Sequence, residues 1–209
     1  MLSHVIAGAL GYLLGSFPTA YLLVRWKSNI DIRNAGSGNV GTLNSYVVTN
    51  SKLVGGAVLL LDLLKGMGIV LLAGGLFENS FAIQATAGIG AVLGHNFPVW
   101  LSFKGGRGLA PAAGVMLALG WIFVAAWGIW WFLGFRVSKN VNIGNTVACL
   151  ATLLMILFSP DVVLARLNSV DVGGGEFRYF ALVLFGIILS RHIEPVVEFV
   201  KNRGVVPKE

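Results

Sequence analysis

Long runs of apolar residues, separated by short polar or glycine-rich segments, form the basic pattern of this chain. A helix needs about 20 mostly apolar residues to cross the hydrocarbon core of a bilayer. Because the runs approach this length and carry few charges, we interpret them as transmembrane helices. The expected spans are Leu2–Val24, Leu53–Leu76, Phe81–Leu101, Leu109–Phe135, Ile143–Phe158 and Phe180–Leu189 with its flanking residues.

The longest run, Leu109–Phe135, allows either one tilted helix or two short helices folded at Leu119-Gly120. Cytoplasmic segments of membrane proteins carry an excess of Lys and Arg, which distinguishes the two alternatives. With two helices, seven spans and an outer N-terminus, the inner segments hold 12 of the 15 basic residues, and the outer segments hold Arg166 and Arg178. With one helix, the split becomes eight inside against six outside. The twelve are Arg25, Lys27, Arg33, Lys52, Lys104, Arg107, Arg136, Lys139, Arg191, Lys201, Arg203 and Lys208.

The charge pattern therefore predicts an all-α integral membrane protein with seven transmembrane helices, some of them short. Its N-terminus lies outside, its C-terminus lies in the cytoplasm, and residues 1–209 form a single membrane-embedded domain. The segment Ser159–Arg178 contains Pro160 and three consecutive glycines, which predict a surface connection between the last two spans.

Composition excludes several classes of protein. Of the 209 residues, 56% are hydrophobic and 11% are charged, whereas a soluble domain carries about 25% charged residues. The mean hydropathy is +0.81. An ordinary soluble enzyme, a disordered chain and a nucleic-acid-binding module are therefore excluded, and the net charge of +6 reflects basic residues that flank apolar runs.

A first polar segment, Arg33–Asn44, lies on the predicted inner face. Its glycines alternate with Ser and Asn, a pattern that lets backbone N–H groups turn together toward an anion. The segment is either such a phosphate cradle or a flexible glycine-rich loop. Its candidate phosphate-binding residues are Gly36, Ser37, Gly38, Asn39, Thr42 and Asn44.

A second polar segment, Gly94–Gly108, opens with His-Asn and closes with Lys-Gly-Gly-Arg-Gly. The glycines and two cations precede an apolar run, and a helix N-terminus there would attract an anion. Alternatively, the two cations only set the orientation in the membrane, and the histidine is a hydrogen-bonded residue at a helix end. The candidates are His95, Asn96, Lys104, Gly105, Gly106, Arg107 and Gly108.

Asp62 and Lys65 place opposite charges inside the second predicted span. Charges within a membrane are costly, and they are usually paired or functional. At a spacing of three residues they share a helix face and can pair with each other. The alternative is that Lys65 binds a phosphate. No spacing typical of a metal site or of a serine nucleophile is present.

These segments resemble those of one known family. Ser16–Tyr21, Gly36–Asn44, Asp62–Gly66 and Gly94–Gly108 occur in the order and at the spacing found in the bacterial acyl-phosphate:glycerol-3-phosphate acyltransferases of the PlsY type. The likeness extends over nearly the whole chain, and its most specific part is Gly-His-Asn-Phe-Pro followed by Phe-Lys-Gly-Gly-Arg-Gly. The family is a seven-helix integral membrane enzyme, which agrees with the topology expected from the basic residues.

The resemblance implies a reaction in which an acyl group moves from acyl phosphate to the 1-hydroxyl of glycerol 3-phosphate. The products are lysophosphatidic acid and inorganic phosphate, and the reaction begins phospholipid synthesis on the cytoplasmic face of the inner membrane. No metal or coenzyme is implied, and the partners are the two substrates and the lipid bilayer, without nucleic acid.

By the match, Ser37, Asn39, Thr42 and Asn44 position phosphate, and Lys104 with the glycines 105–108 forms a second cradle. His95 and Asn96 orient the acceptor or the reacting carbonyl, and Lys104 joins them as a catalytic candidate. Because an acyl phosphate is already activated, positioning and charge stabilisation supply most of the catalysis. A substrate phosphate can itself accept the hydroxyl proton.

The chain also departs from the family pattern. Val47 stands where the family has an arginine, and Pro195 stands where an asparagine is expected after His192. The serine usually found at the start of the sixth span is not evident near residues 141–145, and Arg107 replaces a lysine. His192 and Asp62 remain possible site residues, and Arg33 or Lys52 is a candidate to replace the missing arginine.

These departures keep three alternatives open. In the first, the chain acylates a different polyol phosphate, which keeps the chemistry and changes the acceptor. A second class of function is a non-catalytic membrane binder or transporter of phosphorylated lipid precursors, and a third is a structural subunit. The alternatives are distinguished by measuring acylated products, uptake of phosphate esters into liposomes, and binding of phosphate esters.

Overall fold

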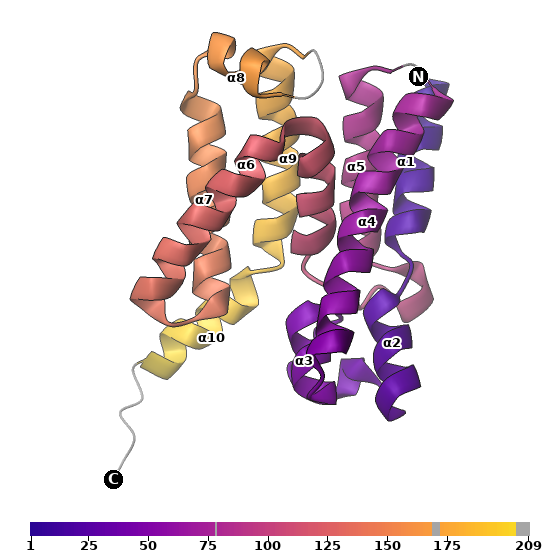
Figure 1. The fold of residues 1–209 in the computed structure, drawn as a ribbon, viewed down its shortest axis with the longest axis vertical. Coiled ribbons are helices and arrows are strands. Elements are labelled where there is room, and N and C mark those ends of the chain that lie inside the picture. Colours follow the sequence, from indigo (N-terminus) through magenta and orange to yellow (C-terminus); the bar gives the residue numbers. More distant parts are fainter. Residues whose placement is uncertain (78, 169–171, 204–209) are drawn as a thin grey trace.

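The computed structural model describes residues 1–77, 79–168 and 172–203, and throughout these residues the secondary structure is helical, without a strand. Figure 1 shows long helices running roughly along one axis, with shorter helices α2, α3 and α10 at one end and α8 at the other. The elements are α1 (Leu2–Gly15), α2 (Thr19–Ser28), η1 (Ile32–Asn34), α3 (Thr42–Thr49), α4 (Lys52–Leu76), α5 (Phe81–Asn96), η2 (Val99–Leu101), α6 (Leu109–Ser138), α7 (Val141–Phe158), α8 (Asp161–Leu167), α9 (Gly174–Ser190) and α10 (Ile193–Arg203).

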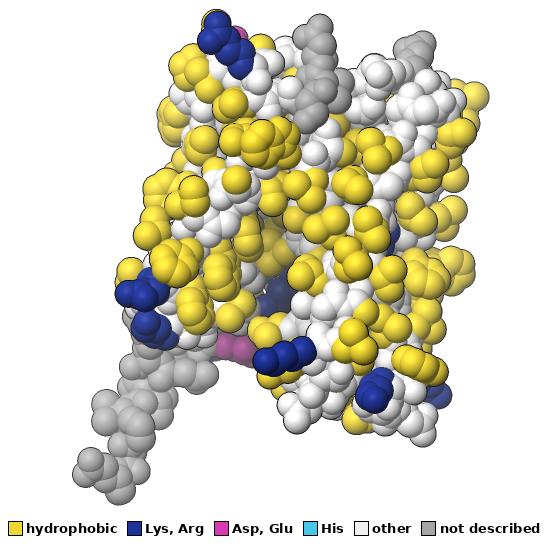
Figure 2. Space-filling view, in the orientation of Figure 1, with side chains coloured by type: hydrophobic (Ala, Val, Ile, Leu, Met, Phe, Trp, Pro, Cys, Tyr) yellow, Lys and Arg dark blue, Asp and Glu magenta, His cyan; other side chains and the backbone are white. Residues whose placement is uncertain are grey.

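Several of these helices meet the length and apolarity needed to cross a membrane. Within the described residues, four segments qualify, or five if α9 and α10, which are bent by 46°, count as one span. Figure 2 shows apolar side chains spread over the whole height of the visible face, with few charged side chains along its middle. Such a surface suits the hydrocarbon core of a bilayer, where backbone polar groups must be satisfied within helices. The prediction of an all-helical membrane protein is confirmed at this level.

Glycines bring α1 and α5 into close contact. A Cβ on Gly15 would collide with the backbone of Ala91, and a Cβ on Gly94 would collide with the backbone of Tyr12. Small residues allow helices in membranes to approach this closely. The Tyr12 hydroxyl also donates to the carbonyl of Phe97, at 2.8 Å. α1 therefore fixes the C-terminal end of α5.

The longest apolar run is divided into two helices at Leu119-Gly120, as predicted. Gly120 has φ −169° and ψ 70°, which interrupts the helical backbone of α6. Figure 1 shows the two parts of α6 meeting at a turn close to α9 and diverging from it. The buried rings of Phe123 and Phe177 lie 5.3 Å apart beside this turn, so aromatic packing stabilises the bend.

Two expected boundaries are wrong, and one expected span consists of two helices. The first apolar run is divided into α1, which ends at Gly15, and α2, which begins after Pro18, whose ring cannot continue a helix, but Leu2–Ser28 still qualifies as one candidate span. The third span ends at Asn96 rather than at residue 101. The expected surface connection contains α8, and its glycines 174 and 175 belong to α9. Lys208, one of the predicted inner basic residues, lies outside the described residues.

Candidate functional site

A cavity of about 660 Å³ lies between the side formed by α3 and α4 and the side formed by α6 and α7. Figure 2 shows the surface hollowed at this place, with basic side chains inside. Its volume is in the range of small-molecule sites. The predicted site residues that line it are Asn39, Thr42, Asp62, His95, Arg107 and Gly108. Lys52, a candidate to replace the family arginine, also lines it, and lining residues that the sequence did not indicate include Tyr46, Trp127, Trp131, Asn142 and Asn145.

Asn44 organises the first glycine-rich segment. The residue is 4% exposed, and its Oδ1 accepts a hydrogen bond from the backbone N–H of Ser37, at 3.0 Å. Its Nδ2 donates to the carbonyls of Ala35 and Asn39, both at 3.0 Å. The Asn44 amide therefore holds the loop in shape, and it is not among the residues that line the cavity.

Left-handed backbone conformations complete this loop. Gly36 and Gly38 have φ of 59° and 70°, values that glycine adopts without strain. A Cβ on Gly36 would also collide with the amide of Asn44. Asn39 and Thr42 face the cavity, whereas Ser37 is exposed and outside its lining.

His95 connects the second segment to the charges in α4. Lys65 Nζ lies 2.9 Å from Asp62 Oδ1 and 3.0 Å from His95 Nδ1. The predicted pairing of Asp62 with Lys65 is therefore present. Lys65 borders a small neighbouring pocket, and the large cavity is lined instead by Asp62 and His95.

Backbone contacts hold the 105–108 loop beside His95. The N–H of Gly106 donates to the carbonyl of His95 at 3.0 Å, and Arg191 Nε donates to the carbonyl of Gly106 at 3.3 Å. A Cβ on Gly106 would collide with the imidazole of His95. A Cβ on Gly105 would collide with the His95 carbonyl and the ring of Pro98. Glycine at 105 and 106 is therefore required for the close approach of the loop.

Asn96 is fully buried next to Gly108. Among the described residues, neither polar atom of its amide has a hydrogen-bond partner. The cavity wall does not include Asn96. The structure thus places this catalytic candidate behind the cavity surface.

Arg107 brings a positive charge into the cavity. Its guanidinium donates to Oδ1 of Asn142 at the start of α7. Burial and the nearby Arg191 lower the pKa of Arg107, while Glu194 and Glu198 of α10 act in the opposite direction. An arginine remains protonated under physiological conditions, so Arg107 is a permanent cation at the cavity wall.

Two other candidates lie elsewhere. Lys104 is exposed, and within the described residues it is not part of the cavity lining. His192 is buried, and its Nδ1 donates to the carbonyl of Ile188 at 2.9 Å. This bond fixes His192, in the turn between α9 and α10, against the C-terminal end of α9.

Arg33 and Lys52 differ in their surroundings. Arg33 makes a bidentate ion pair with Asp31, with a closest distance of 2.6 Å, and hydrogen bonding from Arg33 lowers the pKa of the Asp31 carboxyl. Lys52 is exposed and, like Arg107, lines the cavity. Val47, at the position of the family arginine, is 59% exposed and lies outside the cavity lining. Of the two cations proposed to replace that arginine, Lys52 is at the cavity.

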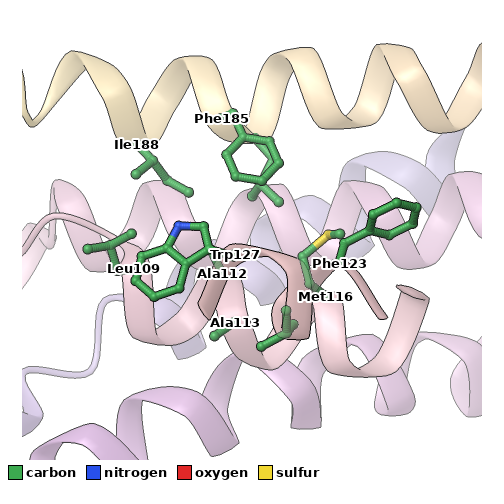
Figure 3. A pocket seen from close by; sticks show the side chains of 10 residues that line it. Leu109, Ala112, Ala113, Met116, Phe123, Trp127, Phe185 and Ile188 are labelled. Carbon is green, nitrogen blue, oxygen red and sulfur yellow. The ribbon is translucent and has the colours of Figure 1, made fainter. Parts of the chain in front are cut away.

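An apolar cavity of about 60 Å³ adjoins the large one and lies between α6 and α9. Figure 3 shows Trp127 and Leu109 at one end and Phe123 and Met116 at the other. Trp127 and Leu109 line both cavities. The indole Nε1 of Trp127 donates to Cys149 Sγ at 3.4 Å, which orients the ring between the polar and apolar spaces.

Comparisons with known proteins agree with this arrangement. Residues 5–202 match the profile of the family described as "Glycerol-3-phosphate acyltransferase". A relative of that name from Thermotoga petrophila is 39% identical over 150 residues, which cover 71% of this chain and 76% of the relative. One from Myxococcus xanthus is 42% identical over 176 residues, with 84% and 88% coverage.

A solved structure is also similar over almost the whole chain. The crystal structure of PlsY (YgiH), an integral membrane glycerol 3-phosphate acyltransferase in its glycerol 3-phosphate form, superimposes with a TM-score of 0.80 at 29% identity. The match covers 96% of this chain and 94% of that chain. A lysophosphatidic acid form of the same protein gives a TM-score of 0.79 at 28% identity. This chain therefore belongs to the glycerol-3-phosphate acyltransferase family.

Proposed function

We propose that the protein transfers an acyl group from acyl phosphate to the 1-hydroxyl of glycerol 3-phosphate. The observation that carries the proposal is the large cavity, which combines two cations, Lys52 and Arg107, with a direct border to an apolar cavity. Phosphate groups need cations and N–H donors, whereas an acyl chain needs apolar surface. Both requirements are met on opposite sides of Trp127.

In the proposed reaction, the hydroxyl oxygen attacks the acyl carbonyl carbon and forms the new ester bond. The bond from this carbon to the phosphate oxygen breaks, and inorganic phosphate leaves with the electron pair. The hydroxyl proton passes to a phosphate oxygen, so the products are lysophosphatidic acid and phosphate. The chain's own residues bind and orient the two substrates and stabilise developing charge.

The phosphate-binding residues are assigned by their position around the cavity. Asn39 and Thr42 lie on one side, and Arg107 with the glycine loop lies on the other. Lys52 supplies the second cation in place of the family arginine. Lys104 reaches the phosphates from the exposed surface through its flexible side chain.

The acyl chain enters the apolar cavity between α6 and α9 with its first methylenes, as the volume of about 60 Å³ allows. Its carbonyl end stays in the large cavity, and the chain passes Trp127 toward Phe123. Apart from the indole N–H, the lining consists of apolar side chains and one thioether. Burial of each methylene is worth about 0.8 kcal/mol, which favours this position for the hydrocarbon.

The site faces the cytoplasm in a seven-span topology of the inner membrane, with the N-terminus outside. The break at Gly120 supports the extra span, and Figure 2 shows most of the visible Lys and Arg side chains toward the end that carries α2, α3 and α10. Cysteines placed singly at Ser37 and Ser102 are expected to resist an impermeant thiol reagent added from outside. Ready labelling from outside would contradict the topology.

The direct test is product formation by the purified protein in lipid. We expect palmitoyl phosphate and glycerol 3-phosphate together to yield lysophosphatidic acid and phosphate, and palmitoyl-CoA to be unused. Lys104→Ala is expected to lose most of this activity, while Lys27→Met, a change at an exposed α2 residue, retains it. If product formed only with another polyol phosphate, that compound would replace glycerol 3-phosphate as the proposed acceptor. Absence of any acyl transfer, by folded protein, would reject the proposal.

A further inference from the structure

Three ionisable side chains meet at the wall of the large cavity, which two of them line. Asp62 is 1% exposed, and the Lys65 and His95 side chains are 8% and 7% exposed. Lys65 Nζ forms an ion pair with Asp62 Oδ1 at 2.9 Å, and it lies within hydrogen-bond distance of His95 Nδ1, at 3.0 Å, and of the carbonyl oxygen of Phe17, at 3.2 Å. A lysine ammonium has three N–H donors, so it can serve both acceptors while its charge balances that of Asp62.

This geometry defines which nitrogen of His95 carries the proton. The Asp62 carboxylate keeps Lys65 in its ammonium form, because a buried anion requires a cation beside it. An ammonium has no lone pair with which to accept a hydrogen bond, so His95 Nδ1 must be the unprotonated acceptor. Asp62 Oδ1 lies 3.8 Å from Nδ1, which is too far for a hydrogen bond.

The other side of the imidazole faces the loop and the cavity. Nε2 of His95 is the atom closest to a Cβ built on Gly106, and His95 contributes to the cavity wall. With Nδ1 occupied by Lys65, the neutral ring carries its hydrogen on Nε2. The neutral ring therefore has its N–H donor on the side of the 105–108 loop.

We propose that Lys65 is a positioning residue that fixes His95 as the Nε2–H tautomer, so that His95 donates a hydrogen bond to a substrate oxygen and does not act as a base. The proposal rests on the acyl transfer proposed above, and it specifies how His95 serves that reaction. A fixed donor stabilises charge that develops on oxygen in the transition state. Asp62 and the Phe17 carbonyl hold Lys65 in place.

The tautomer can be measured without turnover. Protonated and unprotonated ring nitrogens give well-separated ¹⁵N resonances, and the chain has 3 histidines. We would record spectra of full-length protein with ¹⁵N-labelled histidine in lipid bilayers, and His95→Gln would assign the His95 signals. The expected wild-type result is Nε2 protonated and Nδ1 unprotonated. A protonated Nδ1 would overturn the proposal.

Variants then test whether Lys65 sets the tautomer. In Lys65→Met, we expect the Nδ1–H tautomer of His95 to appear, while Lys27→Met leaves the wild-type spectrum unchanged. If Lys65→Met does not fold, Asp62→Asn tests the same point, because loss of the carboxylate lets a neutral Lys65 amine accept from Nδ1. An unchanged His95 spectrum in the folded variant would overturn the role of Lys65.

Kinetics distinguish a donor from a base. The side-chain amide of glutamine can donate near the position of Nε2, but it cannot accept a proton as a base. We expect His95→Gln to retain kcat/KM about tenfold above that of His95→Ala, consistent with one hydrogen bond to developing charge. Equal loss in both variants would contradict the donor role.

Kinetics of Lys65→Met distinguish a residue that positions His95 from one that binds phosphate directly. Because Lys65 acts through His95 and does not line the large cavity, we expect kcat to fall about tenfold while KM for glycerol 3-phosphate stays within about twofold. A large rise in KM with unchanged kcat would instead mean that Lys65 binds phosphate directly. If the tautomer is as expected but no acyl transfer occurs, the proposed function fails and the assignment of the tautomer stands.

Discussion

Asn44 and Asn96 are both buried and both belong to glycine-rich segments near the large cavity, yet their amides have opposite surroundings. Asn44 bonds to the backbone of its own loop on both sides of the amide. The side-chain amide of Asn96 has no hydrogen-bond partner among the described residues. The same residue type thus holds the backbone in one segment and remains unbonded in the other.

The two glycine-rich segments also differ in how each builds its loop and in which side chains it presents to the cavity. The first uses its most buried polar side chain to build a loop, and it presents Asn39 and Thr42 to the cavity. The second uses glycines to build a close-packed loop, and it presents His95 and Arg107. A polar residue in a glycine-rich segment is therefore informative only once its hydrogen bonds are known.

Gly106→Ala is expected to have the largest effect, because it acts on the second segment where side chains face the cavity. The added Cβ would collide with the His95 imidazole, displacing both His95 and the Arg107 loop. We expect kcat/KM to fall about 10³-fold, the size seen when a donor to the transition state is lost. Gly186→Ala, where a Cβ meets nothing within 4 Å, is the control, and equal losses in both would break the comparison.

Asn44→Leu tests the first segment through stability. Removing the amide leaves at least three buried or partly buried backbone groups without their partner, so we expect a loss of about 2–4 kcal/mol in the free energy of unfolding. Asn96→Leu removes no protein hydrogen bond and is expected to cost less than about 1 kcal/mol. Denaturation of both variants in the same detergent measures the difference. A cost for Asn96→Leu as large as that for Asn44→Leu would show that the two asparagines are not contrasting cases.

Lys52→Met and Arg33→Met compare two cations near the first segment. Lys52 lines the cavity, whereas Arg33 is already paired with Asp31. Loss of a charge-assisted hydrogen bond costs about 1.5–3 kcal/mol, so we expect KM for glycerol 3-phosphate to rise at least about tenfold in Lys52→Met. Arg33→Met is expected to change it less than about twofold. A larger rise in KM for Arg33→Met than for Lys52→Met would place the phosphate at the loop that contains Arg33 rather than in the cavity.

Trp127→Ala is expected to give the smallest effect, since it acts where the polar cavity meets the apolar one. Loss of the indole widens the passage between them, so the rate ratio for acyl phosphates of different chain length should change by about three- to tenfold. KM for glycerol 3-phosphate should stay within about twofold. Trp127→Phe, which keeps an aromatic ring, is the control, and an unchanged ratio in Trp127→Ala would place the acyl chain elsewhere.

Much of this architecture could be predicted from the sequence. Apolar runs and the distribution of Lys and Arg indicate membrane helices, and the break at Gly120 follows from the length of its run and the distribution of basic residues. The segments near the cavity are also recognisable, because glycine with Ser, Asn, Lys and Arg between apolar runs is unusual. These signals are local, so one sequence contains them.

The bonding of individual side chains is not predictable in this way. Lys65 meets His95 across 30 positions of sequence, and Arg107 meets Asn142 across 35. Only the packing of α4, α5 and α7 determines which atoms approach. For the same reason Lys52 was no more than one of two possible cations, and its place at the cavity required the three-dimensional structure.

The most direct test of this account is the affinity of the full-length protein in lipid for glycerol 3-phosphate, measured by calorimetry. Wild type is compared with the double variant Lys52→Met/Arg107→Met and with Lys27→Met/Lys139→Met, which removes the same charge at positions that do not line the large cavity. We predict binding at least about 100-fold weaker in the first variant, by the loss of two charge-assisted contacts, and near wild type in the second. Equal binding by all three proteins would contradict the assignment of the phosphate to this cavity.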